Sequence, residues 1–179
     1  VSVVDTTAPS MLQLEDVIAD ATSSTNNIVK LISPIADDAI SDIVIQNNAP
    51  SVFPFGETLV IWSAEDESGN ISYIDHRVII VDNSPPELIP STDIIIDATS
   101  LENIIEIGLP QISDIIDRQP IITNDAPEFF PLGETIVTWT ATDTSGNSVS
   151  ETQSVSVVDT TAPSMLQLED VIADATSST

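Results

Sequence analysis

Residues 53–70, FPFGETLVIWSAEDESGN, decide the expected fold of this chain. Val60, Trp62 and Ala64 alternate with other residues, which places them on one face of an extended strand. A Ser-Gly-Asn turn follows, and a second run of alternating apolar residues covers 71–81. A strand, a tight turn and a second strand predict a β-hairpin, with the face of the first strand that carries Trp62 turned toward a core.

The same stretch returns 77 residues later as FPLGETIVTWTATDTSGN at 130–147. In addition, residues 1–25 recur letter for letter at 155–179, a period of 154 residues and therefore twice 77. We therefore expect a tandem array. Its parts are the last strand of a preceding module at 1–4, modules at 5–81 and 82–158, and the start of a third module at 159–179. We expect the array to continue beyond this sequence.

Within a module, further short apolar runs lie at 11–19, 27–32 and 43–45, and no capped amphipathic helix is present. The pattern predicts an all-β module, an antiparallel immunoglobulin-like β-sandwich of six or seven strands. Pro34 and Pro110 stand 76 rather than 77 residues apart. We expect this one-residue slip to be compensated in a loop before Asp37 and Asp114.

The composition excludes several classes of function. Asp and Glu number 29 against three Lys and Arg, so the formal net charge is −26 and contact with nucleic acid or an anionic membrane is disfavoured. The absence of Cys excludes thiol chemistry, and a single His makes a His-based metal centre or triad hard to assemble within one chain. Yet 41% of the residues are hydrophobic and the mean hydropathy is +0.20, which predicts a folded core rather than disorder.

The order DTTAP, FPxGET, V-x-W-x-A, D-x-SGN and V-x-V-V-D resembles the hyalin repeat (HYR) domain. The resemblance covers both complete modules. It implies immunoglobulin-like sandwiches in tandem, in extracellular and cell-surface proteins, with roles in adhesion or surface architecture rather than catalysis. Many animal members carry a cysteine pair that this chain lacks. The DTTAP opening is also similar to linkers of bacterial and archaeal immunoglobulin-like adhesin arrays.

Carboxylates and amides gather in the sequence at the seams and beside the Ser-Gly-Asn turns. Such oxygen-only groups suit Ca²⁺, and we expect it to stiffen the joints between modules. The alternative is that the same side chains only cap their own turns. The candidate ligands are Asp5, Asp82 and Asp159 at the seams, with Asp66, Asn70, Asp143 and Asn147 at the turns.

Three other residue types are candidates for a functional role, and each also has a structural explanation. His76 aligns with Gln153, which favours a surface His over a catalytic one. Asn70 begins the sequon Asn-Ile-Ser and is a glycosylation candidate, although the turn alone explains an Asn there. Trp62 and Trp139 could serve as sugar platforms, but their parity predicts core positions.

The two modules differ on the outer face of the hairpin. Module one has Ile61, Tyr73 and Ile79 where module two has Thr138, Ser150 and Ser156. The first set is a candidate interface with neighbouring copies. Alternatively, these residues occur here only because they favour β-strands, and they contact no partner.

These observations predict a structural or adhesive tandem-repeat segment of a long extracellular cell-surface protein, forming a stalk or filament. Its expected partners are neighbouring copies of the module, through self-assembly, or surface proteins. No catalytic residues and no cofactor other than Ca²⁺ are expected. The alternative is a ligand- or glycan-binding accessory module of a larger secreted protein, which calls for an aromatic groove, but only 4% of the residues are aromatic.

Overall fold

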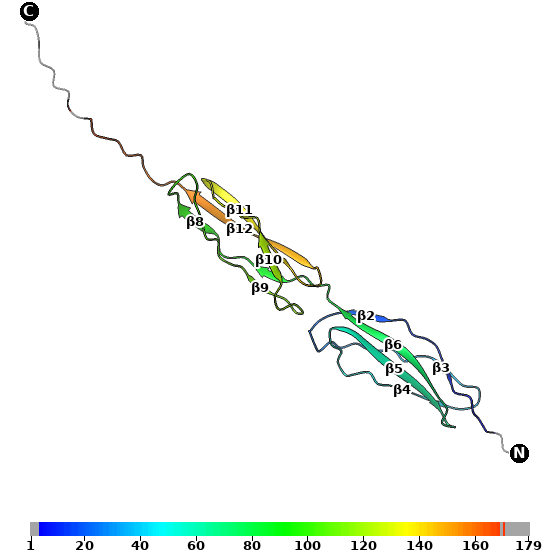
Figure 1. Cartoon of the computed structure of the whole chain (residues 1–179). Helices are drawn as coiled ribbons and strands as arrows, with labels where there is room; N and C mark the ends of the chain where they lie inside the picture. Colours follow the sequence, from blue (N-terminus) through cyan, green and yellow to red (C-terminus); the bar gives the residue numbers. More distant parts are fainter. Residues whose placement is uncertain (1–3, 169, 171–179) are drawn as a thin grey trace, which may run out of the picture.

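The computed structural model describes residues 4–168 and 170 and shows two groups of strands, one following the other along the chain (Figure 1). No helix in this part of the chain is long and apolar enough to cross a membrane. The strands are β1 (Ser10–Met11), β2 (Val17–Asp20), β3 (Ala36–Asp37), β4 (Ile43–Asn47), β5 (Gly56–Asp66), β6 (Ile71–Val81), β7 (Glu87–Ile89), β8 (Ile94–Asp97), β9 (Gln111–Ser113), β10 (Ile121–Asn124), β11 (Gly133–Thr142) and β12 (Ser148–Val158).

Each group contains a four-stranded and a two-stranded sheet. The orders are β2-β6-β5-β4 with β1-β3, and β8-β12-β11-β10 with β7-β9. The predicted all-β fold and the hairpin are confirmed: β5 and β6 pair antiparallel from Gly56↔Ile80 to Glu65↔Ile71. Gly69 in the connecting turn has φ +85°, a conformation that costs a residue with a Cβ about 1 kcal/mol or more.

One pairing differs from the expected antiparallel arrangement. β2 runs parallel to β6, and β8 runs parallel to β12. The cause is a change of sheet within one run: β1 pairs with β3 in the small sheet, and the chain then continues into β2 at the edge of the large sheet. The predicted strand at 11–19 is therefore split in two.

The strand expected at 27–32 does not form a paired strand in the described chain. Only Asn27 pairs, in an isolated bridge with Phe53. Beyond it the side chains still alternate: Val29 and Leu31 pack on the core, whereas Ile28 is 85% exposed. This segment is extended but lies outside the sheets.

The core of each module surrounds its tryptophan, as the strand parity predicts. Trp62 and Trp139 are 4% and 2% exposed, and each indole N–H donates to a buried side chain. Trp62 Nε1 donates to His76 Nδ1 at 3.2 Å, and Trp139 Nε1 donates to Gln153 Oε1 at 3.0 Å. The prediction of a surface His76 is wrong, since its parity on β6 places it on the inner face, 3% exposed.

The end of the first module is covered by the second. Ile116, in the loop between β9 and β10, packs against the first module's core cluster and is half-buried. Its counterpart in the first module, Ile40, is 72% exposed. Likewise Ala21 is buried at this joint, while its counterpart Ala98 is only half-buried. The joint thus contains an apolar contact as well as polar groups.

Candidate metal centre

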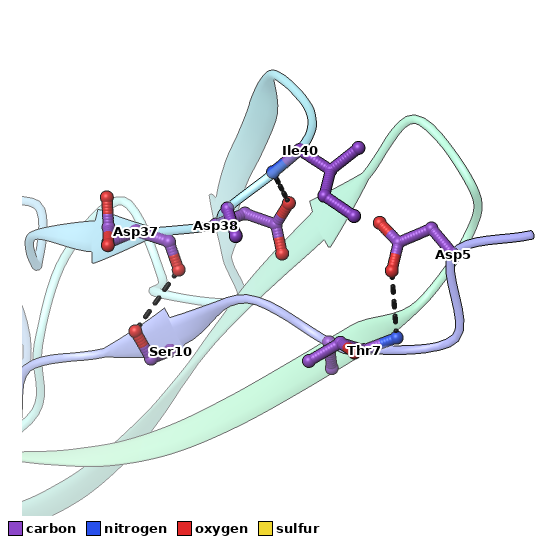
Figure 2. A pocket seen from close by; sticks show the side chains of 8 residues that line it. Asp5, Thr7, Ser10, Asp37, Asp38 and Ile40 are labelled. Atoms are coloured by element: carbon purple, nitrogen blue, oxygen red, sulfur yellow. Dashed lines mark hydrogen bonds between the residues drawn. The ribbon is translucent and has the colours of Figure 1, made fainter.

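Three aspartates from distant parts of the sequence meet at the outer end of the first module. Asp5 precedes β1, Asp38 follows β3, and Asp66 ends β5. One carboxylate oxygen of each lies within 4.8 Å of the other two. Figure 2 shows Asp5 and Asp38 on either side of the same pocket, each with one oxygen bonded to a backbone amide.

The second module repeats this arrangement at the joint with the first. Asp82, Asp114 and Asp143 again place carboxylate oxygens within 4.8 Å of one another. Asp82 immediately follows β6, so this centre lies where one module passes into the next. We call the two sets the seam centres.

The deepest member of each seam centre is fixed by the Ser-Gly-Asn turn. Asp66 accepts from the Asn70 backbone N–H at 2.8 Å and from Asn70 Nδ2 at 2.7 Å. Asp143 and Asn147 repeat both bonds. Burial would raise the pKa of Asp66, but the hydrogen bonds from Asn70 and the turn amides outweigh it, so the pKa lies below its ordinary value near 3.8. The pKa of Asp143 is lowered by the same balance.

The two asparagines also connect these turns to the seam backbone. Asn70 Nδ2 donates to the Asp5 carbonyl at 3.4 Å, and Asn147 Nδ2 donates to the Asp82 carbonyl at 3.1 Å. Only Oδ1 of each amide therefore remains to bind a cation. Attachment of a glycan at Asn70 Nδ2 would remove an N–H that these bonds use, which argues against the glycosylation candidate.

The seam aspartates form the expected Asx-type turns. Asp5 Oδ1 accepts from Thr7 N at 3.0 Å, and Asp82 Oδ1 accepts from Ser84 N at 3.2 Å. The remaining oxygens differ: Asp82 Oδ2 accepts from Ser145 Oγ, whereas Asp5 Oδ2 is buried without a hydrogen-bond partner in the described structure. A buried carboxylate oxygen without a partner is costly unless a cation or water reaches it.

Asp38 and Asp114 are the members that the sequence reasoning missed. Asp38 Oδ1 accepts from Ile40 N at 2.9 Å and Ser41 N at 3.1 Å, and Asp114 Oδ1 bonds the two corresponding amides. Asp114 therefore corresponds to Asp38 rather than Asp37, and the predicted position of the slip is wrong. The 76-residue spacing already holds between Asn27 and Asn103, and the 77-residue spacing returns only in the loop before β4 and β10. Tracking that spacing would have found Asp38.

Asp159, the third seam candidate, is exposed. It repeats the Asx-type turn, with Thr161 N donating to Oδ1 at 3.0 Å. No other candidate ligand joins it among the described residues.

The interface candidates lie on the outer face of the β5–β6 hairpin without forming one patch. Ile61 is 39% exposed and Tyr73 64% exposed, whereas Ile79 is half-buried. In the register, Ile61 faces Asp75 and Ile79 faces Glu57, so the two Ile stand roughly four residues, or about 13 Å, apart along the hairpin.

Fold and sites together define a class of protein: tandem immunoglobulin-like β-sandwich repeats with an acidic centre at the seam of each module. No protein family model matches the chain. Hyalin of Lytechinus variegatus is 33% identical over 147 residues, which cover 73% of this chain and 26% of that protein. Hyalin of Strongylocentrotus purpuratus is 32% identical over 149 residues, 73% of this chain and 12% of that protein.

The two complete modules are hyalin repeats, as their motifs predict. A rat protein named for sushi, von Willebrand factor type A, EGF and pentraxin domains is also 34% identical, over 104 residues or 55% of this chain. The chain spans about a quarter or less of the length of each of these relatives.

Among solved structures, the chain is similar to human protocadherin-24 EC1-2, with 12% identity and a TM-score of 0.43. The match covers 87% of this chain and all of that one. The protocadherin γB4 extracellular domain matches with 14% identity and a TM-score of 0.40, over 83% of this chain and 32% of that one.

Proposed function

We propose that this chain is a segment of an extracellular adhesive repeat protein in which Ca²⁺ binds the seam centres and stiffens the array. The similarity to hyalin supports the general role. The observation that carries the calcium proposal is the seam centre itself, built twice from three aspartates and, in the first module, containing a buried oxygen with no partner.

The ligand set favours Ca²⁺ over other cations. All ligand atoms are hard oxygens, and the three acidic residues of each centre come from separate segments of the chain. Ca²⁺ accepts six to eight oxygens in flexible geometry, whereas Mg²⁺ demands a compact octahedron and keeps its waters. Three negative charges at close range repel one another until a cation neutralises them.

A bound ion would join three segments at one end of a module: the entering chain, the loop after the third strand and the hairpin tip. In the second module the entering chain is also the exit from the first module. Fixing Asp82 against Asp114 and Asp143 therefore restricts the angle between modules. Stiffness then extends along the array one joint at a time.

Thermal unfolding with calcium and with chelator tests this proposal. At calcium concentrations about 100-fold above Kd, binding to the native state alone contributes about 2.7 kcal/mol per site. For modules of this size, the unfolding midpoint should rise by on the order of 10 °C. The variant Asp38→Asn with Asp114→Asn should lose most of the shift, because Asn keeps the Oδ1 acceptor of the turn but removes the charge.

The matched control is Asp42→Asn with Glu128→Gln, which removes the same charge at exposed positions outside the seam centres. It should retain the calcium shift. An equal unfolding midpoint in calcium and in chelator would refute the metal site. If calcium shifts the unfolding midpoint equally in both double variants, its effect is general screening of the −26 charge and not binding at the seam centres.

A further inference from the structure

A cavity of about 260 Å³ opens on the first module, away from the seam centres. It lies between the segment that leads into β2 and the extended segment around 30–32. Aliphatic walls dominate it, with one acidic and one basic residue in the lining. The residues are Leu14, Glu15, Val17, Lys30, Ile32 and His76.

His76 is the buried member of this lining, at 3% exposure. Its Nδ1 accepts the indole N–H of Trp62, so Nδ1 has no proton and the neutral ring holds its proton on Nε2. Nε2 makes no hydrogen bond to any residue that the structure describes. His76, which lines the cavity, therefore carries an oriented N–H donor with no partner among the described residues.

The second module shows how the same position is satisfied internally. Gln153, the counterpart of His76, is fully buried and uses its whole carboxamide. Oε1 accepts from Trp139, and Nε2 donates to the Thr92 and Ile107 carbonyls at 2.9 and 3.0 Å. That amide joins the segment before β8 to the segment after it. In the first module, His76 makes no such bonds within the described chain, and the cavity lies between the corresponding segments.

We propose that this cavity binds a small, neutral aliphatic carboxamide. The amide oxygen accepts from His76 Nε2, and a short branched stem packs against Leu14 and Val17. Glu15 and Lys30 oppose one another in charge, and the net charge of −26 repels anions, so a neutral ligand is favoured over a carboxylate. This site is independent of the seam centres and of the proposed adhesive role.

Two tryptophans, one per module, supply matched reporters in the intact chain. Isobutyramide is titrated into the ¹⁵N-labelled protein while both indole N–H signals are followed by NMR. We expect a saturable shift of the Trp62 signal and none of Trp139. Isobutyrate, of the same shape but charged, should bind about tenfold more weakly.

The His76→Gln variant tests the donor, because Gln already occupies this position in a folded module. It should abolish the saturable shift while the unfolding midpoint stays within a few degrees. Equal responses of both indoles, no response of Trp62, or a saturable shift that persists in His76→Gln would overturn the proposal. Equal affinity for isobutyrate would overturn the assignment of a neutral ligand.

Discussion

At the residue scale, the aspartates of the seam centres form turn caps, which the sequence presented as one of two alternatives. The hydrogen bonds expected of simple turn caps are present at Asp5, Asp66 and Asp82. One carboxylate oxygen of each aspartate still lies within 4.8 Å of the other two in its centre, so the caps hold in place the oxygens that we propose bind a cation. Preorganised oxygens lose less freedom when a cation binds.

The lowered pKa of Asp66 and of Asp143 predicts acid sensitivity. A carboxyl group whose pKa is lower in the folded than in the unfolded state stabilises the fold above its unfolded pKa. That contribution is lost as pH falls below about 4 and through the folded values. Urea unfolding in chelator between pH 7 and pH 2.5 should show stability falling in this window.

The variant Asp66→Asn with Asp143→Asn should be less stable at pH 7 and flatter across the same pH range. Glu67→Gln, next to Asp66 but exposed, is the control and should follow the parent profile. An unchanged slope in the double variant would contradict the role assigned to these two carboxyl groups.

At the element scale, the hairpin could be predicted because its alternation and turn are local. The parallel edge strand could not, because the sheet change between β1 and β2 depends on tertiary pairing. Asp38 was not predicted as a ligand because differences in loop length cancel over a whole module. This cancellation hides the 76-residue spacing that relates Asp38 to Asp114. The burial of His76 was not predicted for another reason: its polar side chain favoured a surface position, although its place in the strand alternation indicates the inner face. A buried indole N–H also needs an acceptor, which His76 supplies to Trp62.

The outer faces of the two hairpins should differ in self-association. In module one, Leu59 and Ile61 are exposed along β5, with Tyr73 on the neighbouring strand. Module two has Ile136 in place of Leu59 but the hydroxyl residues Thr138 and Ser150 in place of Ile61 and Tyr73, and Ser150 hydrogen-bonds to Thr140. We propose that the first face contacts neighbouring copies. The variant Ile61→Thr with Ile79→Thr, copying the polar character of module two, should lower lateral association in analytical ultracentrifugation.

The control for that prediction is Ile136→Thr, which removes an exposed Ile from the same face of module two. It should leave association unchanged. Arg77 bonds Asp16 and lies on β6 between Ile79 and the residue opposite Ile61, so removal of Ile61 alone should account for most of the effect. Association that survives the double variant would exclude this face as the interface.

At the scale of the whole molecule, the joint combines a polar and an apolar constraint. Ile116 covers the end of the first core, and the second seam centre lies beside it in sequence. The apolar part does not depend on cations. Ile40, the counterpart of Ile116 in the first module, has no neighbouring module against it in the described structure and is exposed.

Ile116→Ser should loosen the joint without unfolding either module. Loss of a half-buried side chain costs about 1 kcal/mol. In chelator, ¹⁵N relaxation should show the rotational correlation times of the two modules diverging, while Ile40→Ser leaves them matched. Correlation times that stay coupled in Ile116→Ser would show that the joint is fixed without this contact.

The parallel pairing of β2 with β6, repeated by β8 with β12, has a mechanical consequence. The chain enters each module through the short strand β1 or β7, continues into the first strand of that pair and leaves at the end of the second. Tension along the array therefore slides the two strands past one another and loads their backbone hydrogen bonds together, not one after another. We expect each module to resist pulling by shear rather than by opening one hydrogen bond at a time.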